Sequence, residues 1–255
     1  MTADQPGTAV YVYGIVPAAE TIEVESPGVG EAGGGVRSVV QGAIAALVSD
    51  VEAGPLAAAR GLRGHWGVLE EAVSKTTVLP VRFGTVLESE TVLLEEYLGA
   101  RHDQLAAQLE ELAGKVQLTV KGFYDEERLL RGVVERSPAV ARLSQGVRGK
   151  PEAATYYDRI RLGELVAGEV EQARESDAAL VLGRLEPLAL AARREPPSTR
   201  DGAVHAAFLV ERGRIDEFSR AVSELAAEVE GRMQLRYLGP LPPYSFTEED
   251  SVAWA

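Results

Sequence analysis

Histidine and cysteine, two residue types that often act as catalysts or metal ligands, are scarce in this chain. Its three histidines, His65, His102 and His205, stand on separate predicted elements, and none has a second ligand at the spacing of a metal site. We therefore expect histidines that face solvent or lie at the edge of the core. The chain has no cysteine, which excludes disulfides, a thiol nucleophile and the common structural zinc sites. The G-x-S-x-G, P-loop and S-x-x-K motifs of hydrolases and phosphoryl-transfer enzymes do not occur.

Two glycine-containing motifs resemble nucleotide-binding signatures in part. Gly28, Gly30 and Gly33 match G-x-G-x-x-G, but strands and not a helix are predicted to follow, so no helix N-terminus would face a pyrophosphate. We expect a plain loop. Residues 121–123 (KGF) begin like an RNA-recognition signature, but acidic residues follow where a stacking platform needs small and aromatic ones. We expect no nucleic acid to bind here.

Arg82 lies in the apolar segment 76–86, TTVLPVRFGTV, which predicts a buried strand. Pro80 removes a backbone donor, so the strand is expected at a sheet edge, at a bulge, or where one of its faces is uncovered. Alternation places Phe83 on the face of Leu79 and Val81, and Arg82 on the opposite face. A guanidinium there needs a partner, either a buried carboxylate that fixes the strand or the surface of another protein. Both interpretations of Arg82 stay open.

Composition limits the class of protein. The 255 residues suffice for one large domain or two ordinary ones, and the hydrophobic share of 45% is typical of a globular chain. The net charge of −13 repels nucleic-acid backbones and anionic lipid. The N-terminus lacks the basic region of a signal peptide, and no apolar run is long enough for a membrane span. We expect a cytoplasmic protein.

The order of the predicted helices and strands indicates an α+β fold of two domains followed by a tail. Residues 1–113 are predicted to form an N-terminal mixed α+β domain, with one helix opened by Gly54-Pro55 and a second capped near Ser89. Its first helix should bury Leu62, Trp66, Leu69 and Val73. Residues 114–238 read as βαββαβ with extra helix in the first crossover, a modified ferredoxin-like domain. The predicted strands are 9–16, 36–41, 43–51, 76–86, 116–124, 187–194, 203–211 and 233–238.

The tail, residues 239–255, starts with the proline-rich GPLPPYSF. Its prolines cannot continue a sheet interior, so the segment should cross the protein surface in an extended form. Tyr244 and Phe246 are too large and apolar to be left in water without a reason. We expect both rings to pack across the boundary between the two domains, or else to contact a partner. The acidic residues Glu248–Asp250 should stay in solvent.

Four separated stretches together resemble the GvpF/GvpL family of gas vesicle proteins: YVYGIV at 11–16, TVLPVRFGTV at 77–86, YYDRIRLGELV at 156–166 and GPLPPYSF at 239–246. Their order and spacing fit this family over nearly the whole chain. The chain departs from the family at Leu241, where members usually carry Trp. The residues that represent these signatures as candidate interaction or structural positions are Arg82, Phe83, Tyr156, Arg161, Tyr244 and Phe246.

The resemblance implies an accessory protein needed to assemble gas vesicles, in a chaperone- or nucleation-type role, with no catalytic residues, cofactor or metal. Its implied partners are the small apolar shell protein, of the GvpA type, and other accessory gas vesicle proteins, and its implied location is the cytoplasm and the gas vesicle. An acidic protein that covers an aggregation-prone apolar subunit makes physical sense. Two other classes stay open: a ferredoxin-like small-molecule-binding regulatory module, which a deep polar pocket would favour, and an enzyme built from scattered carboxylates and Arg82.

Overall fold

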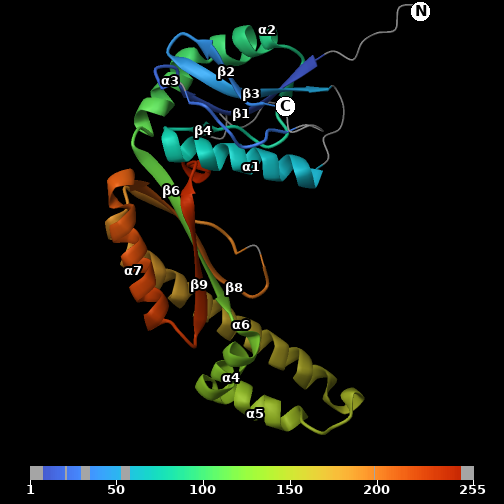
Figure 1. Ribbon diagram of the computed structural model, residues 1–255. Helices are drawn as coiled ribbons and strands as arrows, with labels where there is room; N and C mark the ends of the chain where they lie inside the picture. The colour runs from blue at the N-terminus through green and yellow to red at the C-terminus, as the bar shows by residue number, and fades with distance from the viewer. Residues whose placement is uncertain (1–7, 21, 30–34, 53–57, 198, 248–255) are drawn as a thin grey trace, which may run out of the picture. The chain divides into compact units, whose positions relative to one another are not determined.

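The computed structural model describes residues 8–20, 22–29, 35–52, 58–197 and 199–247 (Figure 1). It is an α+β structure with two antiparallel sheets. The chain divides into two compact units: unit 1 holds 1–118, 209–212 and 239–255, and unit 2 holds 119–208 and 213–238. Gly30, Gly33, Gly54, Pro55 and residues 248–250, which carried expectations above, lie outside the described residues.

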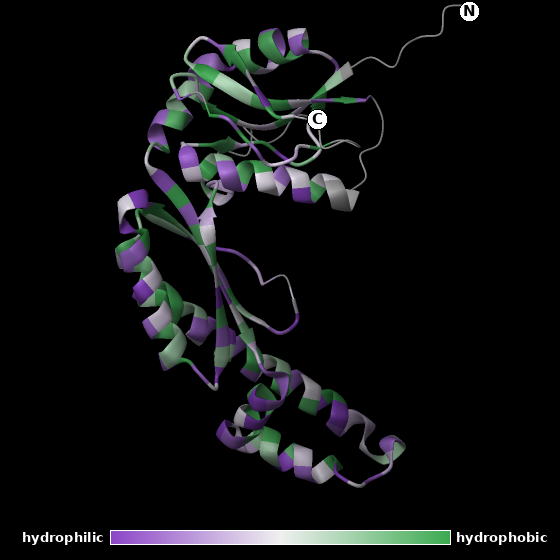
Figure 2. Ribbon diagram, viewed as in Figure 1, coloured by the Kyte–Doolittle hydropathy of each residue, from purple (hydrophilic) through white to green (hydrophobic). Residues whose placement is uncertain are grey.

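Unit 1 is built on a sheet of order β2-β3-β1-β4, with β5 also paired to β1. The long central strands are apolar and β-branched, and Figure 2 shows them largely in the hydrophobic colour. The tight turn between β2 and β3 places Gly42 at φ 59°, a conformation that favours glycine. The strands are β1 (Thr8–Pro17), β2 (Arg37–Gln41), β3 (Ile44–Glu52), β4 (Leu79–Pro80) and β5 (Val86–Leu87).

The expected strand over 76–86 is wrong as a continuous element. β4 and β5 both pair antiparallel with β1, but the six steps from Pro80 to Val86 stand opposite only three steps from Gly14 to Tyr11. The extra residues therefore leave the sheet as a loop. The prediction that Pro80 lies at an edge is confirmed, because β4 is the last strand in its sheet.

Helix α1 (Ala58–Lys75) buries a different face from the one expected. Leu69 and Val73 are in the core, but Leu62 and Trp66 are partly exposed, and the buried face also contains His65. Relative to the expected orientation, the helix is rotated about its axis, because His65 occupies a core position. The prediction counted only apolar residues as buried and so did not include this histidine. The second predicted helix is three segments: α2 (Glu90–Val92), a π-helical segment (Leu93–Gly99) and α3 (His102–Glu111). The N-cap of α2 is the expected Ser89, whose Oγ accepts from the N–H of Val92.

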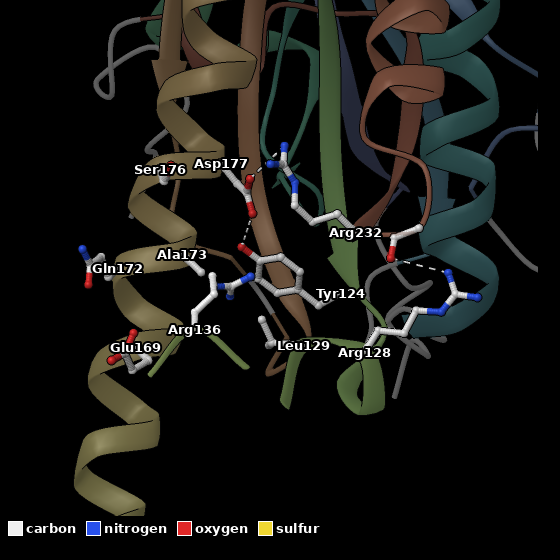
Figure 3. A pocket seen from close by; sticks show the side chains of 11 residues that line it. Tyr124, Arg128, Leu129, Arg136, Glu169, Gln172, Ala173, Ser176, Asp177 and Arg232 are labelled. Atoms are coloured by element: carbon white, nitrogen blue, oxygen red, sulfur yellow. Dashed lines mark hydrogen bonds and ion pairs between the residues drawn. The ribbon is translucent and has the colours of Figure 1, made fainter. Parts of the chain in front are cut away.

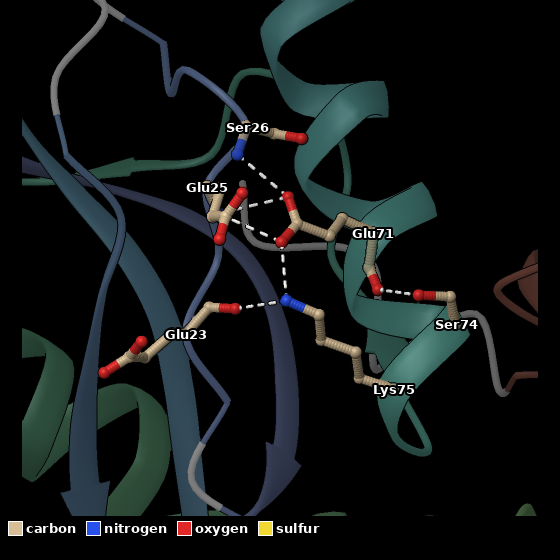
Figure 4. A network of polar contacts seen from close by, with 6 residues as sticks. All are labelled: Glu23, Glu25, Ser26, Glu71, Ser74 and Lys75. Atoms are coloured by element: carbon tan, nitrogen blue, oxygen red, sulfur yellow. Dashed lines mark hydrogen bonds and ion pairs between the residues drawn. The ribbon is translucent and has the colours of Figure 1, made fainter.

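The segment before β2 is fastened to α1 by one carboxylate (Figure 4). Glu71 accepts hydrogen bonds from the backbone N–H groups of Glu25 and Ser26, and it pairs with Lys75 at 2.7 Å. Lys75 in turn donates to the carbonyl of Glu23. These contacts, Lys75 first, lower the pKa of Glu71 to about 2. Glu71 therefore holds two non-adjacent stretches of unit 1 together wherever its carboxylate is charged.

The second sheet has the order β7-β8-β6-β9, and the ends of three of its strands, 115–118, 209–212 and 239–241, group with unit 1. In unit 2, Phe208 on β8 and Phe218 on α7 pack with ring centroids 5.1 Å apart in the core. The strands are β6 (Lys115–Tyr124), β7 (Ala191–Arg194), β8 (Gly202–Glu211) and β9 (Met233–Leu241). The helices are α4 (Glu126–Arg136), α5 (Pro138–Val147), α6 (Glu152–Leu185) and α7 (Ile215–Glu228).

Two boundaries in this half differ from those expected. Helix α6 ends at Leu185 and a 3-10 turn (Glu186–Leu188) follows it, so β7 is shorter than the predicted strand 187–194. Strand β9 runs to Leu241 and includes Pro240. A proline is tolerated there because β9 is an edge strand, where a missing backbone donor costs no ladder hydrogen bond on the open side.

Candidate functional site

The loop between β4 and β5 contains two of the signature residues, Arg82 and Phe83. Residues 82–85 form a tight turn in which the N–H and the Oγ1 of Thr85 both donate to the carbonyl of Arg82. Gly84 has φ 90° at the third position, which glycine alone adopts readily, as in a type II turn. The turn ends the expected strand alternation, so Phe83 does not continue the face of Leu79 and Val81. Its ring instead lies 5.6 Å from the ring of His65.

Arg82 itself is exposed, and among the described residues no ion pair or hydrogen bond involves its side chain. The expectation of a buried pair that fixes the strand is therefore wrong, since the guanidinium sits on a turn that projects from the sheet.

We expect Arg82→Ala to change the free energy of unfolding by less than about 0.5 kcal/mol, because the substitution removes no buried contact. Urea unfolding of the full chain checks this. A loss above about 3 kcal/mol, the cost of breaking a buried pair, would restore the structural interpretation of Arg82.

His65 is the centre of a buried polar cluster that the sequence did not predict. We call Tyr11, Tyr13, His65, Phe83 and Tyr244 the tyrosine–histidine cluster. The Nδ1 of His65 lies 2.8 Å from the hydroxyl of Tyr11, and its Nε2 lies 3.1 Å from the hydroxyl of Tyr244. A neutral imidazole has one donor and one acceptor nitrogen, so His65 donates to one tyrosine and accepts from the other. The expectation of a solvent-facing or edge histidine is wrong for His65, which is 1% exposed.

The two strand tyrosines of the cluster fix neighbouring loops. The Tyr11 hydroxyl accepts from the N–H of Gly84, which anchors the turn that carries Arg82. The Tyr13 hydroxyl accepts from the N–H of Val29 at 2.6 Å and lies 2.8 Å from Oγ of Ser49. Burial raises the pKa of both tyrosines and lowers the pKa of His65 to about 4. All three side chains are therefore neutral near pH 7.

The tail completes this cluster. Tyr244 bonds to His65 and packs 5.4 Å from the ring of Trp66, which explains why Trp66 is only partly exposed. Phe246 packs against the core cluster of unit 1, and the N–H of Ser245 donates to Oε1 of Gln117. The contacts described for Tyr244 and Phe246 involve residues that group with unit 1, and packing of both rings across the domain boundary stays a prediction. The expected extended form is wrong at the two rings, because Tyr244–Phe246 form a 3-10 turn shortly after the end of β9.

The signature residues Tyr156 and Arg161 lie on α6 and are exposed. The exposed fractions are 57% for Tyr156, 82% for Tyr157 and 45% for Ile160. The two tyrosine rings meet edge to face with centroids 5.4 Å apart. In the first half of this long helix, Thr155 is the only described residue classed as buried. These residues therefore offer an aromatic surface to solvent.

A recess of about 650 Å³ lies in unit 2 between α4, α6 and the residues before β9 (Figure 3). At its base the hydroxyl of Tyr124 donates to the buried carboxylate of Asp177 at 2.6 Å, and Arg232 pairs with the same carboxylate at 3.1 Å. Burial, with the hydrogen bond to Asp177, raises the pKa of Tyr124. The sequence analysis missed this recess. The sequence feature that could have indicated it is the four-residue spacing of Arg128, Gly132 and Arg136, which puts two arginines on one side of α4.

The remaining sequence candidates are separate from one another. His102 and His205 are partly buried, on α3 and β8. Phe123, in the RNA-like motif, is covered by the guanidinium of Arg236 at 4.7 Å from the ring centroid. Within the described residues no group of three histidine or carboxylate side chains is arranged to hold a metal ion. No described helix is both long and apolar enough to cross a membrane.

The protein is of the α+β class with two antiparallel sheets; the signature side chains of Arg82, Tyr156 and Arg161 are exposed, and Tyr244 and Phe246 pack into unit 1. The family of gas vesicle synthesis proteins GvpL/GvpF matches residues 9–248. The chain belongs to this family, whose members take part in gas vesicle synthesis and are not enzymes.

Individual relatives agree. Gas vesicle protein F of Streptomyces sp. (strain CB03234) is 37% identical over 243 residues, which is 94% of this chain and all of that protein. The crystal structure of GvpF from Anabaena sp. PCC7120 superposes with a TM-score of 0.76 at 26% identity, covering 94% of this chain and 96% of that one. GvpF from Microcystis aeruginosa gives a TM-score of 0.75 at 26% identity, covering 94% and 99%.

Proposed function

We propose that this protein assists gas vesicle assembly by binding the small apolar shell protein, of the GvpA type, and holding it until it joins the shell. Other accessory gas vesicle proteins are its further partners, and it acts in the cytoplasm and at the growing vesicle. The role is one of binding, in keeping with a family of synthesis proteins that are not enzymes.

The observation that carries this proposal is the exposed face of α6. Tyr156, Tyr157 and Ile160 are all partly or largely in solvent, and they project from a helix that buries little of itself. Tyrosine is enriched in interfaces because it supplies a large contact area with few rotatable bonds and a polar tip. Contiguous exposed apolar groups on a chain of charge −13 suit a factor that covers an apolar partner and itself stays dissolved.

The proposal includes a ferredoxin-like arrangement for the second sheet. Its order, β7-β8-β6-β9, and the placement of α4–α6 before β7 and α7 before β9, support a βαββαβ topology with helices added to the first crossover. The added helices include the exposed part of α6. The insertion therefore supplies the surface that we assign to the shell protein.

The test is recovery of the shell protein from a vesicle-forming cell with the tagged full-length chain. The triple variant Tyr156→Ser, Tyr157→Ser, Ile160→Ser should recover at least about tenfold less shell protein, because central interface aromatics contribute about 2 kcal/mol or more each. Its thermal midpoint should stay near that of the parent, since the three side chains are exposed.

The matched control changes two apolar side chains of similar exposure on other elements, Val40→Ser and Leu190→Ser. This control should recover the shell protein as the parent does. If the triple variant and the parent recover equal amounts, α6 is not the binding face. If mass spectrometry finds no shell protein with the parent itself, the proposed partner is wrong.

A further inference from the structure

The recess in unit 2 has a charge balance unlike the rest of the chain. The formal charge of the whole chain is −13, but the recess is lined by three arginines, Arg128, Arg136 and Arg232, against two carboxylates, Glu169 and Asp177. These five side chains sum to +1. Unit charges close together in a partly enclosed site interact more strongly than charges spread over an open surface. The net positive charge of its lining therefore favours an anionic ligand in the recess, although the protein as a whole is acidic.

The internal contacts leave specific donors available. Asp177 is buried, and its two oxygens are bonded by Tyr124 and Arg232, so this trio is satisfied and forms a fixed wall. Arg128 makes one long contact, 3.5 Å from its Nη1 to the carbonyl of Gly231. Among the described residues Arg136 has neither an ion pair nor a hydrogen bond. Most of the donors of two guanidinium groups thus remain for a ligand.

The backbone of α4 makes room for the most available of these groups. Gly132 lies one turn before Arg136, and a Cβ at position 132 would stand 3.1 Å from Nη1 of Arg136. The arginine side chain therefore folds back along the helix, across the space that a side chain at 132 would fill. Figure 3 shows Arg136 and Glu169 lining the recess from α4 and α6, with Tyr124 and Asp177 joined above them.

We propose that this recess binds a carboxylate carried on a short, uncharged body. Arginine pairs with planar carboxylates through two parallel hydrogen bonds. The balance of +1 suits one carboxylate, whereas a phosphate group with two negative charges would leave the recess with a net charge of −1. Leu129 and Ala173 offer apolar contact for the body of the ligand, and Gln172 and Ser176 offer hydrogen bonds. The carboxylate comes either from an acidic side chain of a polypeptide or from a free small acid.

The experiment follows backbone amide signals of the full chain by NMR during titration with three probes. The probes are N-acetyl-glutamate methylamide for a polypeptide side chain, propionate for a small acid, and N-acetyl-glutamine methylamide as the uncharged match. The glutamate probe should shift signals at the recess residues and saturate, and the glutamine probe should shift none. Tighter binding of the glutamate probe assigns the polypeptide source, and equal or tighter binding of propionate assigns the small acid.

Variants connect the binding to the named residues. Arg136→Gln should weaken binding about tenfold or more, because a hydrogen bond between two charged groups is lost. Glu169→Gln should strengthen it several-fold, because a repelling carboxylate is removed. Arg131→Gln, on the same helix but outside the recess, carries the same charge change and should leave the affinity unchanged. The proposal is overturned if no probe shifts the recess signals, if the glutamine probe binds equally, or if Arg131→Gln weakens binding as much as Arg136→Gln does.

Discussion

A chain that ends after Leu238 is expected to lose several kcal/mol of unfolding free energy, up to roughly 6 kcal/mol from its two rings. The truncation removes Tyr244 and Phe246, which are both partly buried, and full burial of a large ring contributes roughly 1.5–3 kcal/mol. It also takes one hydroxyl partner from His65 and leaves the core cluster beneath Phe246 exposed. Urea unfolding of the truncated and full chains, compared at one pH, measures the loss.

Point variants separate the contributions within the tail. Phe246→Ala should account for a large share of the loss, and Tyr244→Phe should cost about 1 kcal/mol, because it removes a hydrogen bond and keeps the ring. Leu238→Ser is the matched control, since Leu238 is 45% exposed and precedes the removed segment. A truncated chain with the stability of the parent would show that the rings do not support unit 1, and they would then be better interpreted as contacts for a partner.

The stability of the protein should fall by about 3 kcal/mol as the pH is lowered from about 6.5 to about 4, because of His65 alone. The folded structure lowers the pKa of His65 from 6.5 to about 4 by burial. In that pH range the unfolded chain binds a proton at His65 and the folded chain does not, so acid favours unfolding. The contribution is fully present above pH 6.5 and is lost progressively below it.

Replacing the histidine isolates this effect. His65→Gln cannot take up the proton, so its unfolding free energy should decline less between pH 7.5 and pH 4.5 than that of the parent. The parent chain, measured over the same pH range and in the same buffers, is the reference. Equal slopes for His65→Gln and the parent would mean that His65 is already charged, or accessible to protons, in the folded protein.

The sequence predicted the elements that have strong periodicity and missed what depends on tertiary contacts. β1, β3, β6 and β8 follow from apolar β-branched runs, and α7 follows from its apolar stripe. The β4–β5 loop was missed because its residues are as apolar as a strand, and only the φ of Gly84 and the hydrogen bonds of Thr85 reveal the turn. The local sequence pattern does not reveal this loop, because the chain leaves the sheet after β4 and then pairs with the same strand, β1, again through β5.

The tyrosine–histidine cluster could not be predicted from local sequence either. Tyr11 and Tyr13 share an alternation pattern, but nothing local indicates that His65 will lie between Tyr11 and the distant Tyr244. A histidine in an amphipathic helix is more often placed at the surface, and its burial here depends on two hydroxyl partners from separate parts of the chain. The recess in unit 2 likewise needs α4, α6 and the start of β9 together.

The position of the tail has a consequence for the order of events during synthesis. Unit 1 begins with β1 and is closed by Tyr244 and Phe246, so the ribosome releases its first strand more than 200 residues before the rings that complete its core. His65 lacks its second tyrosine partner until Tyr244 is made, and by that point every residue of unit 2 has been made. The first sheet to be translated is thus the last to be finished. Its final packing needs Tyr244 and Phe246, which are made after every residue of unit 2, so a chain that stops before them leaves this unit incomplete.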